Sequence, residues 1–138
     1  MKRRLFAYDY ANNPRNCSPP KLRPDFLVVR DERVVEVLDA KYRDLWEKNL
    51  PREMLYQLAL YAMGQENVER RATILYPTLD GAARQQVILV KDPLRGTAKA
   101  QVVLRPVNLL ILELLLGRKG IEGQRNRAAF AQQLAFGT

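Results

Sequence analysis

The sequence predicts a single α/β domain, residues 1–138, in which helices flank a central mixed β-sheet. Its length of 138 residues fits one domain. The chain has 47% apolar and 28% charged residues, which is typical of a globular protein and is enough for one packed core. Runs of β-branched residues alternate with segments of helical spacing, and the predicted order of elements is β-β-α-β-β-β-α-α.

The first predicted elements are a loop and a β-hairpin. Residues 1–23 are loop-rich, with closely spaced asparagines and prolines, and could be the remnant of a longer chain. A short strand is predicted over 25–29 and a longer, β-branched strand over 34–42. The polar turn 30–33 joins them, so we expect the two strands to pair as a hairpin.

The apolar spacing becomes helical after this hairpin. A helix is predicted with Pro51 in its first turn and Gly64 close to its end. Its apolar residues recur at helical spacing: Leu55, Leu58, Ala59, Ala62 and Met63.

Three more strands and two helices complete the expected fold. The strands are predicted over 72–76, where Pro77 would end the strand, and over 85–90 and 101–107. Asn108 is the expected cap of a helix over 109–116 that ends at Gly117, and a last helix is predicted over 126–135. The helix over 109–116 is apolar around nearly its whole circumference, so we expect it to be buried or covered by another subunit.

The composition excludes several kinds of site. The chain has no histidine and one cysteine, Cys17, which excludes histidine-based triads, His-ligated zinc, an intrachain disulfide and multi-cysteine metal clusters. A bound metal would therefore have oxygen ligands, as Mg²⁺ and Mn²⁺ do. No apolar run is long enough to cross a membrane and no secretory signal is visible, so we expect a cytoplasmic protein.

The charge of the chain suggests a polyanionic partner. The formal net charge is +8, and a near-neutral stretch over 34–76 lies between basic ends. Nucleic acid is the partner that this pattern favours. The candidate phosphate contacts are basic side chains, each of which taken alone could be an ordinary surface charge: Arg23, Arg95, Lys99, Arg118, Lys119, Arg125 and Arg127.

A cluster of charged side chains is expected at the end of the hairpin. Asp39 and Lys41 lie two residues apart in a strand, so they project from the same face. Asp25 begins the neighbouring strand, and the register of the hairpin can bring it close to Asp39. Two carboxylates beside an ammonium group favour a divalent cation, so we expect Asp25, Asp39 and the Ala40 carbonyl to bind Mg²⁺ or Mn²⁺. Lys41 would orient or deprotonate an attacking water and stabilise the charged phosphate.

Two polar residues of the predicted helix could join this cluster. Gln57 and Tyr61 are four residues apart and share one helix face. An amide and a phenol there could hydrogen-bond a phosphate, a carboxylate or Lys41. They could equally be an ordinary amphipathic pair on a core helix.

The order of these motifs resembles a known family. Pro24-Asp25 followed by Asp39-Ala40-Lys41 resembles the PD-(D/E)xK signature of the restriction-endonuclease-like nuclease superfamily. Gln57-Leu58-Ala59-Leu60-Tyr61 is similar to the Q-x-x-x-Y helix element of its RecB-like branch. With the flanking residues over 22–26 and 38–42 and the run Leu75-Tyr76-Pro77, the chain looks most like McrC-type subunits of 5-methylcytosine-specific restriction systems, over residues 22–77.

The resemblance implies a restriction-endonuclease-like core and Mg²⁺-dependent hydrolysis of DNA phosphodiesters by an endonuclease. It implies that Asp25 and Asp39 are metal ligands, that Lys41 is the catalytic lysine, and that Gln57 and Tyr61 support the active site. It also implies a GTP-driven AAA+ partner of the McrB type, and a homo-oligomer is possible. Two alternatives stay open: a RecB-like exonuclease of repair or CRISPR adaptation, and a non-catalytic DNA-binding or assembly module with the nuclease fold.

Structural interpretations also stay open for individual residues. Lys41 could be a solvated lysine at the end of a strand, of the kind that protects sheet edges. Glu36 faces away from Asp39 and is expected to be solvated rather than a ligand. Tyr42 and Trp46 are expected to be packing or rim residues rather than platforms for base stacking.

Overall fold

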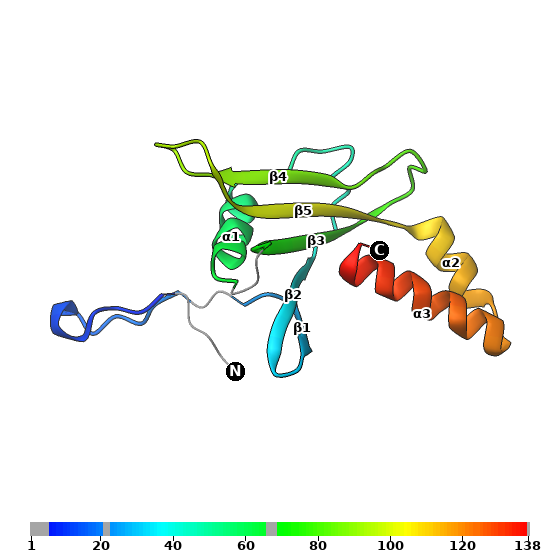
Figure 1. Ribbon diagram of the computed structural model, residues 1–138, viewed down its shortest axis with the longest axis horizontal. Helices are drawn as coiled ribbons and strands as arrows, with labels where there is room; N and C mark the ends of the chain where they lie inside the picture. The colour runs from blue at the N-terminus through cyan, green and yellow to red at the C-terminus, as the bar shows by residue number, and fades with distance from the viewer. Residues whose placement is uncertain (1–5, 21–22, 66–68, 138) are drawn as a thin grey trace.

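The computed structural model describes residues 6–20, 23–65 and 69–137. Within these residues the chain forms an α/β domain with a five-stranded mixed sheet and three α-helices, in the predicted order (Figure 1). The sheet order is β1-β2-β3-β5-β4. The strands are β1 (Phe26–Arg30), β2 (Arg33–Ala40), β3 (Arg71–Thr78), β4 (Gln86–Lys91) and β5 (Ala98–Asn108), and the helices are α1 (Arg52–Met63), α2 (Leu109–Gly117) and α3 (Gly120–Phe136). A short 3₁₀-helix, Tyr10–Asn12, precedes them.

Strands β1 and β2 form the predicted hairpin. They pair antiparallel, with Phe26 opposite Leu38, and a bulge lies between Val28 and Val29. The turn residues Asp31 and Glu32 have positive φ angles of 51° and 62°, which matches the twist of a tight two-residue turn. Strand β2 ends at Ala40, two residues earlier than predicted, although the Lys41 N–H still donates to the Leu75 carbonyl of β3.

Helix α1 covers one face of the sheet. It packs against β3 and β5. Because side chains alternate along a strand, one set from each strand points toward this helix. The core contains fully buried residues from β2, α1, β3 and β5, among them Val37, Leu58, Ile74, Tyr76 and Val102.

Two boundaries differ from the prediction. Strand β3 continues through Pro77 and pairs it with Val107 of β5. Strand β2 has already ended beside this position, so the missing N–H of Pro77 faces no strand partner and costs no ladder hydrogen bond. Helix α3 begins at Gly120 rather than at 126, and Gly123 in its first turns packs on Arg118, the cap residue after α2: a Cβ added there would lie 2.8 Å from the Arg118 carbonyl oxygen.

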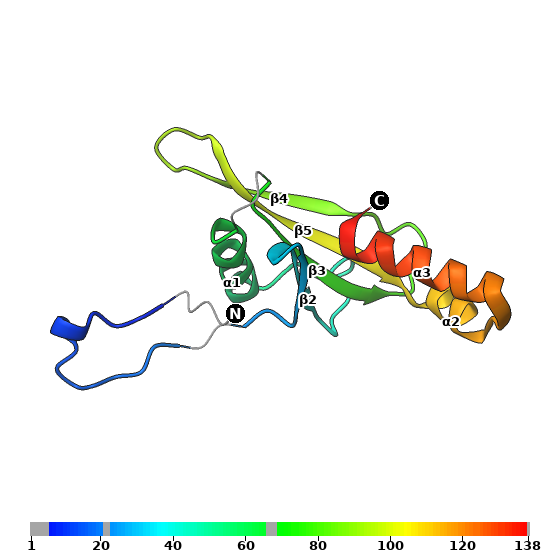
Figure 2. The same cartoon turned by 60° about the horizontal axis from the view of Figure 1, so that its bottom comes forward.

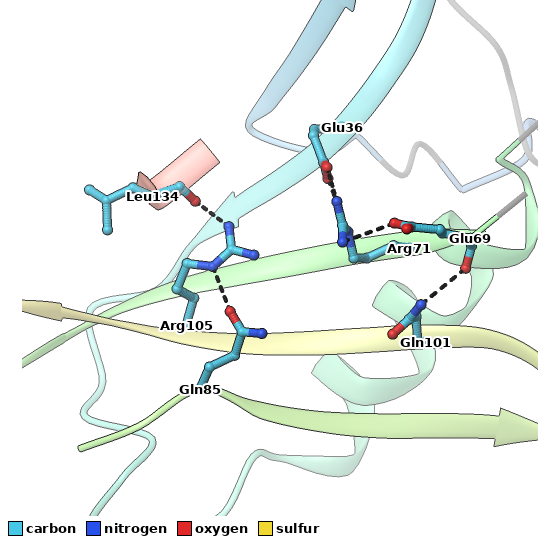
Figure 3. Close-up of polar contacts among 7 residues, drawn as sticks. All are labelled: Glu36, Glu69, Arg71, Gln85, Gln101, Arg105 and Leu134. Atoms are coloured by element: carbon cyan, nitrogen blue, oxygen red, sulfur yellow. Dashed lines mark hydrogen bonds and ion pairs between the residues drawn. The ribbon is translucent and has the colours of Figure 1, made fainter. Parts of the chain in front are cut away.

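The other face of β2 corrects the expectation for Glu36. This side chain is buried rather than solvated, and it forms an ion pair with Arg71 of β3 (Figure 3). Arg71 also pairs with Glu69 at 2.9 Å. Burial lowers the pKa of Arg71, but the hydrogen bond and charge of Glu36 outweigh this and leave that pKa raised. Glu36 does face away from Asp39, as expected. Its carboxylate can be buried because the Arg71 guanidinium on the neighbouring strand β3 neutralises its charge.

A second arginine on the same face holds the end of α3. Arg105 of β5 is buried; it donates to Gln85 at 2.9 Å and to the Leu134 carbonyl of α3 (Figure 3). Burial lowers the pKa of Arg105, and the neighbouring Arg71 lowers it further. Gly137 ends α3 in the left-handed region (φ 78°), where a Cβ would lie 2.7 Å from the Arg105 guanidinium. Arg105 therefore joins the C-terminal end of α3 to the sheet.

Helices α2 and α3 lie side by side at one end of the molecule (Figure 2). Asn108 caps α2 as predicted, since its side-chain oxygen accepts from the Leu110 and Ile111 N–H groups at 3.0 and 3.2 Å. None of the residues of α2 is buried, so nothing in the described part of the chain covers its outer side. No helix in the described ranges is long and apolar enough to cross a membrane.

Candidate active site

The hairpin brings Asp25 to the end of β2. Phe26 pairs with Leu38, so the residue before β1 lies beside the last residues of β2. The Asp25 carboxylate accepts a hydrogen bond from the Ala40 N–H at 2.9 Å. Asp25 is exposed, which leaves its other oxygen accessible to a ligand.

Asp39 and Lys41 form an ion pair on the face that α1 covers. The Lys41 ammonium lies 2.7 Å from a carboxylate oxygen of Asp39. Only 3% of the Asp39 side chain is exposed, against 23% of Lys41. The predicted strand geometry explains the pair, because residues two apart project from the same face. The Lys41 N–H also donates to the Leu75 carbonyl of β3 at 3.0 Å, which fixes its backbone to the sheet.

Helix α1 supplies a hydrogen-bonded pair beside these charges. The Gln57 amide donates to the Tyr61 hydroxyl at 3.0 Å, and Tyr61 is buried. Burial raises the pKa of Tyr61, the Gln57 hydrogen bond lowers it, and the charge of Asp39 raises it. The charges of Lys41 and Asp25 act on the same hydroxyl, the first lowering and the second raising its pKa. The Tyr61 hydroxyl is therefore within electrostatic reach of all three charged side chains.

The oxygen donors of this cluster fit a hard divalent cation. Asp25 and Asp39 each keep one carboxylate oxygen for which no internal partner is recorded among the described residues. The N–H and C=O of a strand residue point to the same side, so the Ala40 carbonyl faces the edge where Asp25 lies. Within the described ranges no group of three or more His, Cys, Asp or Glu side chains could hold a metal. A cation here would use two carboxylates, a carbonyl and water, as Mg²⁺ sites commonly do.

The cluster carries an excess of negative charge. Asp25 and Asp39 contribute two carboxylates against the single ammonium of Lys41. An added cation would relieve the repulsion between the carboxylates, and the exposed side of Asp25 gives it access. The arrangement can bind a cation and present an ammonium group and a phenol to an anionic ligand beside it.

The predicted phosphate contacts lie in three separate regions. Arg23 is exposed two residues before Asp25, so it is close to the charged cluster. Arg95 lies in the turn between β4 and β5, and Lys99 lies at the start of β5. Arg118 and Lys119 lie between α2 and α3, at the opposite end of the molecule from the β4–β5 turn (Figure 1). Only Arg23 is therefore adjacent to the carboxylates.

One group beside Lys41 was missed in the sequence. Asp44 accepts hydrogen bonds from the Thr78 hydroxyl at 2.9 Å and from the Trp46 N–H at 2.9 Å. It thereby ties the segment after Lys41 to the end of β3. The aspartate two residues before Trp46 is a signal for this kind of turn, but its bond to Thr78 joins residues 34 positions apart and has no local signature.

Two aromatic residues of this segment have different roles. Trp46 packs against the core cluster. Tyr42 is fully exposed and belongs to the rim, next to Lys41. Trp46 is therefore a packing residue and Tyr42 a rim residue, both within the roles expected from the sequence.

Comparisons of the chain with protein-family models, with curated proteins and with solved structures found no match. The function is therefore argued from the charged cluster itself.

Proposed function

We propose that the chain is a Mg²⁺-dependent deoxyribonuclease that hydrolyses phosphodiester bonds, similar to the McrC-type subunit of a modification-dependent restriction system. The observation that carries the proposal is the meeting of Asp25 and the Asp39–Lys41 ion pair at the carboxyl end of β2, where the charges of all three side chains act on the Tyr61 hydroxyl of α1. These residues come from β2, the residue after it, α1 and the segment before β1, yet they are the same residues that the motif resemblance singles out. A structural ion pair alone would not require Asp25 and Tyr61 beside it.

Each residue has a role that follows from its position. Asp25, Asp39 and the Ala40 carbonyl would hold the cation. When bound, Mg²⁺ supplies Lewis-acid polarisation of a phosphoryl oxygen and lowers the pKa of a coordinated water. The Lys41 ammonium, partly exposed and held by Asp39, orients the attacking water and stabilises the negative charge that develops on the phosphate. Gln57 donates to the Tyr61 hydroxyl and so holds it in place, within reach of the charges of Asp25, Asp39 and Lys41.

DNA is the substrate that the charge favours. The net charge of +8 attracts a polyanion, and Arg23 is exposed next to Asp25, where it can contact a phosphate. The proposal extends to a GTP-driven AAA+ partner of the McrB type and to a cytoplasmic setting, both of which rest on the resemblance and the composition.

A cleavage assay tests the proposal directly. Supercoiled plasmid DNA, with and without 5-methylcytosine, is incubated with the protein in Mg²⁺, Mn²⁺ or EDTA. We expect nicking or linearisation that needs the metal and is lost in Asp39→Asn and in Lys41→Met. Lys91→Met, which changes an exposed lysine at the end of β4, is the matched control and should cut like the parent. Cleavage by both site variants at the parental rate would refute the proposal, and cleavage of linear DNA alone would identify an exonuclease.

A non-catalytic DNA-binding module is the second candidate. It is favoured by the fact that each carboxylate already has an internal partner, Lys41 for Asp39 and the Ala40 N–H for Asp25. Isothermal titration with Mn²⁺ separates the two candidates. A nuclease site should give saturable heat and raise the melting temperature, and both effects should disappear in Asp39→Asn. DNA binding without either effect would support the module.

A further inference from the structure

Tyr42, the residue directly after Lys41, exposes its whole side chain to solvent. Among the large apolar and aromatic side chains that are exposed in the described ranges, only Tyr42 and Tyr10 do so completely. Partly exposed residues of this kind are common on any protein, because they still pack on one side. A fully exposed ring makes no packing contact with its own chain, so Tyr42 contributes nothing to the core and both faces of its ring are open.

The chain on either side of Tyr42 is attached to the sheet. The Lys41 N–H donates to a carbonyl of β3 at 3.0 Å, and the Asp44 carboxylate accepts from the hydroxyl of the last residue of β3 at 2.9 Å. Leu45, which follows, is buried in the core cluster. The chain bends at Tyr42 and Arg43, between these two attachments, and both side chains are exposed. Only these two residues are therefore presented to solvent between anchored neighbours.

Basic side chains flank this tyrosine. Arg43 follows it, and no hydrogen bond or ion pair of the Arg43 side chain is recorded among the residues that the structure describes. Lys41 precedes it, and Arg23 is exposed two residues before Asp25. Proteins bind unpaired nucleic acid with this combination, in which cations contact the phosphates and an aromatic ring stacks on a base.

The neighbours of Tyr42 also favour DNA over a protein as the molecule that covers the ring. Lys41 and Arg43 are both basic, whereas charged residues are depleted at the core of a protein interface. The net charge of +8 attracts a polyanion to the same molecule.

We propose that the candidate active site takes single-stranded or locally unpaired DNA, with Tyr42 stacked on a base next to the phosphate that Lys41 contacts and Arg43 on a neighbouring phosphate. This inference rests on the proposed function and names the form of DNA that the site accepts. Consecutive Cα atoms are about 3.8 Å apart, so the Tyr42 ring reaches only nucleotides close to that phosphate. In a duplex the bases are paired and stacked on each other, so the ring gains this contact only where a base has left the stack. The sequence alone disfavoured base stacking by Tyr42, and its complete exposure beside Lys41 is what favours it.

Fluorescence anisotropy of labelled oligonucleotides tests the proposal in EDTA, so that binding is measured without hydrolysis. The ligands are a thymidine strand of roughly 12 nucleotides, an abasic strand with the same number of phosphates, and a duplex of the same length. We expect the parent protein to bind the thymidine strand about tenfold more tightly than the abasic strand, because only the first offers bases to the ring.

Variants of Tyr42 separate the ring from its other properties. Tyr42→Ala should weaken binding of the thymidine strand about tenfold and change the affinities for the abasic strand and the duplex by less than about twofold. Tyr42→Phe keeps the ring and should bind like the parent, whereas Tyr42→Leu keeps only apolar volume and should bind like Tyr42→Ala. Tyr10→Ala is the matched control and should bind like the parent. Tyr10 is also fully exposed, but it lies in the 3₁₀-helix that Figure 1 and Figure 2 show away from the sheet.

A variant of Arg43 tests the phosphate contact separately. Arg43→Gln should weaken the thymidine and abasic strands by the same factor and reduce the slope of log affinity against log salt by about 0.7. Unchanged affinity and slope in this variant would overturn the phosphate contact.

Two results would overturn base stacking by Tyr42. The first is equal affinity of the parent for the thymidine and abasic strands, and the second is equal affinity of Tyr42→Ala and Tyr10→Ala for the thymidine strand. Cleavage of DNA by a protein that binds both strands equally would overturn this inference and leave the proposed function intact. Binding that depends on bases and on Tyr42, in a protein that cuts no DNA, would support the contact and overturn only the proposed function.

Discussion

The replacement Lys41→Met should destabilise the folded protein, because it leaves a buried carboxylate without its cation. The methionine keeps most of the volume of the lysine stem and removes only the ammonium group. The Asp39 side chain is 3% exposed, and the lost ammonium group lay 2.7 Å from its oxygen. The change therefore tests the electrostatic contribution of the pair with little change in packing.

The size of the effect follows from this geometry. At 2.7 Å, with an effective dielectric constant near 20, the direct attraction between the two charges is about 6 kcal/mol. The 23% exposure of Lys41 and the desolvation of both groups offset most of this, so the net loss of unfolding free energy should be about 1–3 kcal/mol. For a domain of 138 residues this lowers the melting temperature by roughly 3–10 °C.

Differential scanning calorimetry and urea unfolding at neutral pH and low salt measure the change. Lys91→Met, at an exposed position, should melt within about 1 °C of the parent. The double variant Asp39→Asn with Lys41→Met should recover part of the lost unfolding free energy, because residue 39 then carries no unpaired charge in the buried position. If Lys41→Met and Lys91→Met melted at the same temperature, the pair would contribute no stability and the reasoning would be wrong.

Three further predictions concern other parts of the molecule. The Tyr76 hydroxyl is buried with no hydrogen-bond partner among the described residues, so Tyr76→Phe should raise the unfolding free energy in urea by about 1 kcal/mol. Burial raises the pKa of Tyr76 above 10.0; the unfolded chain therefore loses this proton first, and stability should fall as the pH rises past 10.0, less steeply in the variant. Gly123→Ala should cost about 2 kcal/mol and speed proteolysis within α2, because the added Cβ meets the Arg118 carbonyl at 2.8 Å. Arg105→Met removes the donor to the Leu134 carbonyl, so hydrogen exchange should accelerate at the C-terminal end of α3 and stay unchanged in the β1–β2 hairpin.

The elements that have strong local signals were predicted correctly. The order of strands and helices, the hairpin and the Asn108 cap all follow from residues that lie within a few positions of each other. The predicted hairpin allowed Asp25 to approach the end of β2 but did not determine the register of the two strands. The observed pairing of Phe26 with Leu38 determines that register and therefore the position of Asp25.

The features that were missed depend on contacts between distant residues. Glu36 is buried because β3 places Arg71 beside it, 35 positions along the chain. Pro77 does not end β3, because β5 pairs with it on one side while β2 has already ended on the other. Neither the pairing of β3 with β5 nor the end of β2 can be read from the residues around Glu36 or Pro77.

The two faces of β2 show why a cation is expected at only one of them. Strand alternation sends Glu36 to one face and Asp39 to the other, and each carboxylate is buried beside a basic side chain. On the Glu36 face Glu36 and Glu69 both pair with Arg71, and Arg105 on the same face donates to Gln85 and to the Leu134 carbonyl (Figure 3).

On the Asp39 face Asp25 adds a second carboxylate to the Asp39–Lys41 pair, and among the described residues no ion pair of Asp25 is recorded, although Arg23 lies two residues before it. The buried Asp39 is compensated by Lys41, whereas Asp25 is exposed and needs no such partner for the fold. The Asp25 carboxylate, which accepts from the Ala40 N–H, is exposed, so an ion from solvent can reach it. The accessible second carboxylate on this face therefore supports the proposed cation site at Asp25 and Asp39.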